Sequence, residues 1–140
     1  MIKKIISLFC VVFMVTSCSN DDDVNTNCDQ LVEVSGEQFK NAPNDQHFIN
    51  SVAINGDCLN ISFSSGGCDG DSWEIKLIDS EVVLFSSPPQ RNLRLSLKNE
   101  ELCDAVITKE ITFDIQALQV SGNQILLNIE NFEDQISYEY

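Results

Sequence analysis

The chain contains six cysteines, and their spacing limits the chemistry open to their thiols. They are Cys10, Cys18, Cys28, Cys58, Cys68 and Cys103. Structural zinc sites use cysteine pairs with roughly two to four residues between them. Cys58 and Cys68 are ten positions apart, so no such pair is available here. We therefore expect no metal, and we interpret the cysteines as sites of cross-linking or modification.

The segment Ser65 to Trp73, which reads SGGCDGDSW, is the most distinctive candidate for a binding loop. Its candidate binding residues are Asp69, Gly70, Asp71 and Trp73. Calcium prefers clustered oxygen ligands, and Asp57 nearby would add one, but the EF-hand pattern is absent. We favour a Gly/Asp-rich turn held by a disulfide, without a cofactor. A small ligand, a glycan or calcium remains the alternative.

His47 is the only histidine, which limits acid–base and nucleophilic catalysis. A catalytic serine or cysteine needs a base beside it, and nothing in the sequence pairs His47 with such a nucleophile. We interpret His47 as a surface or turn residue at the start of a strand. No catalytic residue is predicted, and the protein is expected not to be an enzyme.

The first residues carry the features of an export signal. Lys3 and Lys4 precede an apolar run, Ile5 to Val15, which has about half the roughly 20 residues that span a bilayer. The following Val-Thr-Ser-Cys resembles the processing site of bacterial lipoprotein signals. This resemblance implies removal of residues 1–17 and lipidation of Cys18, with several acyl chains as a stable anchor.

The residues after Cys18 bear on the destination of such a lipoprotein. Ser19 stands where, in familiar Gram-negative sorting, an aspartate would retain the protein at the inner membrane, so the outer membrane is favoured. Asp21, Asp22 and Asp23 resemble an export tag for the cell surface, which we favour over the periplasmic face; a solvated tether is the other interpretation. Residues 18–27 are the expected lipidated cysteine and acidic tether, which leaves 28–140 as one domain.

Charge excludes some classes of partner. The chain has 8 basic and 22 acidic residues, a net charge of −14, and loss of Lys3 and Lys4 would make it −16. Such a chain repels polyanions, so we expect no nucleic-acid partner and no charge-driven binding to anionic lipid. The predicted partners are the membrane, through the lipid anchor, and an unknown envelope protein or glycan.

Four cysteines remain after Cys10 and Cys18, an even number in an exported protein. Cys28, Cys58, Cys68 and Cys103 are therefore predicted to form two disulfides, for which three pairings exist.

Apolar residues recur at every second position from about residue 48 to the C-terminus, which is typical of strands with one face on a core. The main runs are Leu59-Ile61-Phe63, Trp73-Ile75-Leu77, Leu93-Leu95-Leu97, Ile111-Phe113-Ile115, Ile125-Leu127-Ile129 and Ile136-Tyr138. About eight short strands predict an all-β fold, an antiparallel immunoglobulin-like β-sandwich, with a small β-barrel as the alternative.

Two hairpins can be placed from turn residues. A turn at Asn55-Gly56 sets Val52 opposite Leu59 and Phe48 opposite Phe63. A weaker turn at Asp79-Ser80 sets Leu77 opposite Val82 and Ile75 opposite Leu84. One helical turn is possible at 99–104. Alternation places Asn92, Arg94 and Lys98 on the solvent face of their strand.

The run GGCDGDSW, followed by ELCDAVITKEITFDI, resembles a family of uncharacterised bacterial outer-membrane and surface lipoproteins. The resemblance covers roughly 47–129, on a Gly-Gly-Cys turn and a later Cys-acidic-Ala segment. The matching positions are Gly66, Gly67, Cys68, Trp73, Cys103, Asp104, Ala105, Phe113 and Asp114. Asp71 stands where many members have a histidine, so no role for a histidine carries over. The resemblance implies no activity, but the two cysteine segments are one reason to pair Cys68 with Cys103 and Cys28 with Cys58.

Together these features predict a lipid-anchored envelope or cell-surface lipoprotein that acts as a non-catalytic interaction module. The alternative is a lipoprotein that binds a small ligand, a glycan or calcium.

Overall fold

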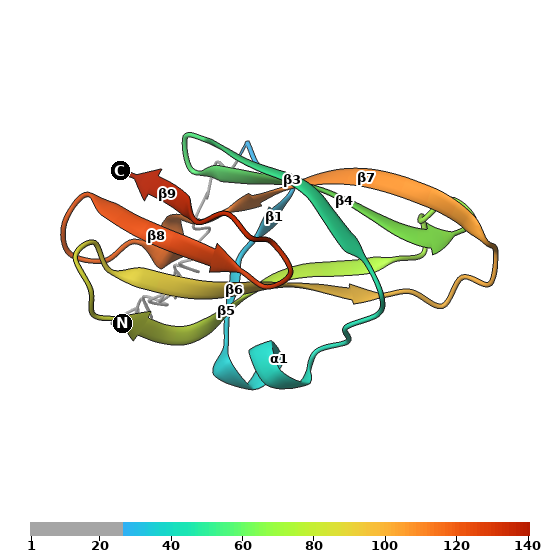
Figure 1. The fold of residues 1–140 in the computed structure, drawn as a ribbon, viewed down its shortest axis with the longest axis horizontal. Coiled ribbons are helices and arrows are strands. Elements are labelled where there is room, and N and C mark those ends of the chain that lie inside the picture. The colour runs from blue at the N-terminus through green and yellow to red at the C-terminus, as the bar shows by residue number, and fades with distance from the viewer. Residues whose placement is uncertain (1–26) are drawn as a thin grey trace, which may run out of the picture.

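The computed structural model describes residues 27–140. The expected signal peptide 1–17, the lipidation site Cys18 and the tether up to residue 26 lie outside the described residues. Figure 1 shows an elongated two-layer arrangement of strands with one short helix against it. Its elements are β1 (Gln30–Leu31), β2 (Glu33–Val34), α1 (Gly36–Asn41), β3 (Phe48–Asn55), β4 (Cys58–Gly67), β5 (Glu74–Leu84), β6 (Gln90–Lys98), β7 (Ala105–Asp114), a 3₁₀ turn (Gln116–Leu118), β8 (Gln124–Ile129) and β9 (Ile136–Glu139).

The strands form two open sheets, with the orders β1-β7-β4-β3 and β2-β5-β6-β8-β9. The prediction of an all-β sandwich is confirmed at this level, and the alternative of a closed barrel is wrong for the part of the chain that the structure describes. Both sheets are mixed rather than antiparallel, because β1–β7, β2–β5 and β6–β8 pair in parallel. This strand order does not clearly follow an immunoglobulin domain.

The parallel pairs arise where the chain passes between the layers. β1 lies beside β7 in one sheet, and β2, only two residues later, lies beside β5 in the other. Val32, between them, is buried and donates its N–H to the carbonyl of Asp114 at 3.0 Å. One extended segment thus supplies an edge strand to each sheet, without the turn that an antiparallel hairpin needs.

The core lies between the sheets and follows the predicted alternation. Leu59, Ile61 and Phe63 of β4 face Leu93, Leu95 and Leu97 of β6 across it. Phe113, Ile115, Ile125, Leu127 and Tyr138 complete its buried centre. Because alternate residues of each strand are inward, the outer faces carry most of the polar strand residues, together with exposed Phe48 and Val106.

The first predicted hairpin exists, but its register was wrong by two positions. Asn55 pairs with Cys58, so the loop residues are Gly56 and Asp57, and Val52 lies opposite Ile61. Gly56 has φ +59° and Asp57 is not at positive φ, as in a type II′ turn rather than the type I′ turn expected at Asn55-Gly56. A bulge between Ile49 and Ser51 then reverses the alternation, so Phe48 faces solvent opposite Ser64 instead of facing the core opposite Phe63.

The second predicted hairpin was wrong, because β5 continues through Asp79 to Leu84. Asp79 does form a local turn-like contact, in which its Oδ1 accepts the N–H of Glu81 at 2.8 Å. Glu81 has φ +66°, and the pairing with β6 shifts between Asp79 and Val83. The turn chemistry therefore produces a bulge in a strand rather than a reversal of the chain.

The sequence predicted that the outer face of the second sheet is exposed to solvent at Arg94, but helix α1 covers it there. Helix α1, capped by Ser35, whose side chain accepts the N–H of Gln38, packs on β5. Arg94 is buried beneath it and donates to the carbonyls of Gln38 and Ala42, each at 3.0 Å. The solvent-facing prediction for Arg94 was wrong, because α1 and its C-cap residue Ala42 cover this part of β6. The Gln38 carbonyl accepts both the Ala42 N–H and the Arg94 guanidinium. The segment 99–104 is not helical.

No helix within residues 27–140 has the length and apolar character to cross a bilayer.

Candidate interaction site at the Cys68–Cys103 disulfide

Two disulfides lie toward opposite ends of the sandwich. Cys28–Cys58 joins the start of the domain to the β3–β4 turn, and Cys68–Cys103 joins the β4–β5 loop to the segment before β7. We refer to these as the Cys28 end and the Cys68 end. The predicted pairing is confirmed. Each bridge is expected to stabilise the fold by about 2–4 kcal/mol, because it restricts the unfolded chain.

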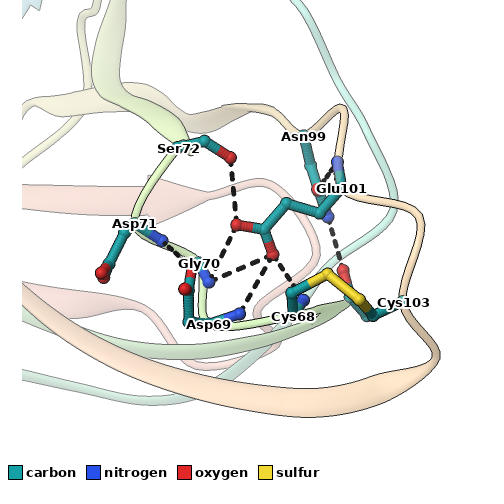
Figure 2. Close-up of a disulfide and its surroundings, with 9 residues drawn as sticks. Cys68, Asp69, Gly70, Asp71, Ser72, Asn99, Glu101 and Cys103 are labelled. Carbon is teal, nitrogen blue, oxygen red and sulfur yellow. Dashed lines mark hydrogen bonds between the residues drawn. A yellow bond between two sulfur atoms is a disulfide. The ribbon is translucent and has the colours of Figure 1, made fainter.

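Glu101 organises the loop that the Cys68–Cys103 disulfide holds. Figure 2 shows its carboxylate pointing into the loop, where it accepts the N–H groups of Cys68 at 2.6 Å and Gly70 at 3.1 Å. It also accepts the hydroxyl of Ser72 at 3.0 Å and the N–H of Asp69 at 3.3 Å. Several amides converging on one anion form a concave anion site, which this chain fills with its own side chain.

The electrostatics of Glu101 follow from these contacts. Partial burial acts to raise the pKa of its carboxyl, but the N–H groups of Cys68 and Gly70, the Ser72 hydroxyl and the Asp69 N–H outweigh it. The net result lowers the pKa to about 2. Glu101 is therefore ionised at neutral pH and acts as a fixed part of the loop. The sequence gives no sign of this role, because the partners of Glu101 lie about thirty positions away.

The remaining candidate loop residues also have partners within the loop. Asp69 Oδ1 accepts the N–H of Asp71 at 2.9 Å, and Asp71 Oδ1 lies 3.2 Å from the ammonium of Lys109. Gly70 is at φ +73°, and a side chain there would meet Lys109 and Trp73. Lys109 also lies over the Trp73 ring, 5.8 Å from its centroid. The loop is thus packed onto β7, with its polar groups largely used.

Trp73 belongs to the core rather than to a binding surface. It is buried, packs on Phe63 with ring centroids 5.9 Å apart, and would collide with any side chain at Gly67. Its indole N–H has no hydrogen-bond partner among the described residues. Its ring is therefore not available as a platform for a glycan.

Asp57 does not join Asp69 and Asp71. It lies at the Cys28 end, where it accepts hydrogen bonds from the Tyr138 hydroxyl and the Gln116 amide, each at 2.6 Å. These two contacts lower the pKa of Asp57. β4 separates the two groups of aspartates by ten residues, about 30 Å of extended chain. Within the described part of the chain, no three His, Cys, Asp or Glu side chains are grouped as they would be around a metal ion.

The Cys68 end carries an open hollow of about 560 Å³ on the outer face of the first sheet. Three strongly exposed apolar side chains line it: Phe48 at 62%, Leu102 at 96% and Val106 at 80%. The pairings Phe48 with Ser64 and Val106 with Gly66 place β3 and β7 on either side of β4. Because Ser64 is small and Gly66 has no side chain, the middle strand forms a low floor between two apolar walls. We call this the apolar hollow.

Asn99 fixes the polar side of the apolar hollow. Its side-chain amide donates to the Gly66 carbonyl at 2.6 Å and to the Ser65 hydroxyl at 3.2 Å, and its N–H donates to Asp45 at 2.7 Å. Asp45 and Asp104 add acidic groups to the lining. The hollow therefore combines apolar walls with an acidic rim, held in place by the disulfide and by Asn99.

His47 is buried, so its prediction as a surface residue was wrong. Its Nδ1 donates to the carbonyl of Asp45 at 2.7 Å, and its ring meets Phe63 edge-on, with centroids 6.4 Å apart. This arrangement is typical of a histidine that orders a loop.

Comparison with known proteins adds the fold but no activity. No protein-family model matches the chain, and no curated protein does. The crystal structure of a protein of unknown function, DUF1344, from Bacteroides vulgatus is similar, with a TM-score of 0.52 and 14% identity over 79% of this chain and 56% of that one. A protein from Parabacteroides distasonis described as toxin-related gives a TM-score of 0.49 and 15% identity, over 78% of this chain and 60% of that one. The chain thus spans less than two thirds of either protein.

Proposed function

We propose that this protein is a lipid-anchored envelope lipoprotein whose domain acts as a non-catalytic interaction module, with the apolar hollow as its binding site. The observation that carries the proposal is the grouping of Phe48, Leu102 and Val106 around one hollow. Soluble domains rarely leave such apolar groups together unless a partner covers them.

The rigidity of the surroundings supports a binding role. The Cys68–Cys103 disulfide, the Glu101 carboxylate and the Asn99 amide all fix backbone that lines or underlies the hollow. A site that is already ordered loses little conformational entropy when a partner docks. The partner that fits is a protein segment with apolar side chains and flanking basic groups, because Asp45 and Asp104 lie among the lining residues.

The anchor is proposed from the N-terminal residues and from the resemblance to surface lipoproteins. Acylation of Cys18 and export place the domain in an oxidising compartment at the outer membrane, preferentially at the cell surface. The two disulfides support such an address, because they persist in oxidising compartments. Two-sheet sandwiches are frequent among cell-surface interaction domains, which supports the proposal by analogy of fold alone.

Photo-crosslinking on intact cells tests the binding site. A photoreactive residue at position 102, in the hollow, is expected to capture one defined protein. The same photoreactive residue at position 110 is the matched control, because this position is exposed on the outer face of β7, as Val106 is, but lies outside the hollow. Equal capture at both positions, or at neither, would contradict the proposal.

A substitution that fills the hollow tests the same binding site independently. A Cβ built on Gly66 meets only the Ala105 carbonyl, at 4.0 Å, and Gly66 is not at positive φ, so Gly66→Val is expected to fold normally. It raises the floor between Phe48 and Val106 and is expected to abolish capture at position 102. Undiminished capture would show that the partner does not enter the hollow.

A further inference from the structure

The Cys28 end carries a second exposed apolar group, formed by the end of β5 and the loop that follows. Phe85 is 98% exposed, and Val82 and Leu84 beside it are also exposed. The chain from Val82 to Gln90 contains no charged residue. We call this segment, residues 82–90, the β5–β6 tip.

The β5–β6 tip lies at the end of the sandwich where the chain enters the fold. Arg91, at the start of β6, donates its Nε–H to the carbonyl of Leu118, just beyond the end of β7. The end of β7 pairs with the start of β4, at Asp114 and Cys58, and Cys58 is bonded to Cys28. In Figure 1 the β5–β6 connection lies at the left, and the connections after β4 and β6 lie at the right.

The β5–β6 tip and the nearby run 116–129 are free of charge, unlike the loops at the Cys68 end. At the Cys28 end, the tip and the whole run from Gln116 to Ile129 carry no charged side chain, although the chain as a whole has a net charge of −14. At the Cys68 end, the loops carry Asp69, Asp71, Glu100, Glu101 and Asp104. The exposed acid Glu139 lies on β9, at the far edge of the sheet from β2 and β5. The acids Asp29, Asp57 and Asp114 at the Cys28 end belong to the first sheet. The uncharged part is the β5–β6 tip of the second sheet, and its exposed apolar side chains suit a surface of low charge.

The chain outside the structure supplies the length that this geometry needs. Residues 19–27 join Cys18 to Cys28 and can span about 30 Å when extended. Phe85 lies six residues beyond Asp79, where β2 pairs with β5, which is about 20 Å along the strand. A membrane anchored at Cys18 is therefore within reach of the tip when the long axis of the sandwich points away from the bilayer.

We propose that the β5–β6 tip is a second membrane contact, with Phe85 inserted at the interface of the bilayer that holds the lipid anchor. This inference rests on the proposed anchor at Cys18. Aromatic side chains are favoured at the boundary between head groups and acyl chains, and a polar loop backbone with Ser86 and Ser87 suits that depth. The contact orients the domain so that the apolar hollow, at the other end, faces away from the membrane.

Tryptophan fluorescence tests the contact. The full chain is expressed, purified from membranes and reconstituted into vesicles of phosphatidylcholine and phosphatidylethanolamine, with or without bromine on the phosphatidylcholine acyl chains. Phe85→Trp is expected to be quenched by the brominated lipid. Val106→Trp, an equally apolar exposed position in the hollow, is the control and is expected to behave like the parent chain, whose only tryptophan is the buried Trp73.

Each outcome decides between the proposals. Quenching at position 85 alone supports the contact. Quenching at neither position, in chains that float with the vesicles, overturns the contact and leaves the anchor standing. Equal quenching at both positions overturns the upright orientation. If the residue at position 85 is shielded in cell envelopes but not in vesicles, the tip contacts a protein partner instead of the lipid.

Flotation separates failure of the anchor from failure of the contact. If the purified chain does not float with vesicles, the proposed acylation is wrong. The mature chain, residues 18–140, is then coupled through the Cys18 thiol to a maleimide-bearing lipid, and the quenching at positions 85 and 106 is read again. Absence of quenching at position 85 in this arm also overturns the contact.

Discussion

The carboxylate of Glu101 lies 2.6 Å from the backbone nitrogen of Cys68, and Cys68 is bonded to Cys103, two residues after Glu101. One covalent and several electrostatic contacts therefore close the same loop. This closure ties the Gly-Gly-Cys turn to the segment that forms one side of the apolar hollow.

Glu101→Gln is expected to loosen the loop, because a neutral amide accepts hydrogen bonds from the N–H groups of Cys68 and Gly70 less strongly than a carboxylate. Amide exchange at Cys68 and Gly70 is expected to become faster, whereas the core amides of β4 stay protected. Glu100→Gln, an exposed neighbouring acid, is the control. Equal exchange in the two variants would show that Glu101 does not hold the loop.

The same contact predicts an acid transition. The pKa of Glu101 is lowered to about 2 in the fold, so its stabilisation is complete above the ordinary value of 4.5 and is lost as the pH falls toward 2. The protection factors of the loop amides, which correct exchange rates for the intrinsic effect of pH and are followed by NMR from pH 6 to pH 2, are expected to fall in that window. Glu101→Gln is expected to remove this pH dependence of the protection factors.

Tyr138 predicts an alkaline transition at the other end. Burial, together with the hydrogen bond to Asp57, raises the pKa of Tyr138 to about 12. Its contribution to stability is therefore complete below the ordinary value of 10 and is lost as the pH rises from 10 to 12. Ultraviolet titration is expected to show delayed ionisation of Tyr138, and Tyr138→Phe is expected to remove that step.

Arg91 and Asp79 form a buried ion pair, 2.8 Å apart, between β5 and β6. Burial raises the pKa of Asp79, although the Glu81 N–H and Arg91 oppose this effect. Arg91→Met leaves the carboxylate of Asp79 buried and unpaired, so it is expected to cost about 3–5 kcal/mol in chemical denaturation. The double variant Arg91→Met with Asp79→Leu is expected to recover much of that loss; no recovery would show that packing, not charge, accounts for the cost.

The period-two pattern was enough to predict the core, because Leu59, Ile61, Phe63 and their partners depend only on which face each residue occupies. The same pattern did not predict how the strands connect and pair. The continuation of β5 past Asp79 depends on Arg91 and Glu81, and the burial of Arg94 depends on carbonyls of α1 more than fifty positions away. The contacts of Arg91 and Arg94 join residues twelve or more positions apart and leave no local signal. The contact between Asp79 and Glu81 is local, but it does not show whether the chain bulges or reverses there.

The site shows the same division. The two disulfides could be predicted from cysteine number and from the resemblance, whereas the apolar hollow could not. Its wall at Phe48 depends on the bulge between Ile49 and Ser51, which turned an expected core residue outward. In the sequence, Gly66 is only one of two adjacent glycines before Cys68, and nothing there indicates that it forms the floor of the hollow.

Mass spectrometry of the mature protein purified from its own membranes tests whether Cys18 carries the lipid anchor. The mature chain is expected to begin at an acylated Cys18, and its four remaining cysteines are expected not to react with iodoacetamide until they are reduced. A chain that still carries Met1, or that begins elsewhere than at an acylated Cys18, would contradict the anchor and the functions proposed from it.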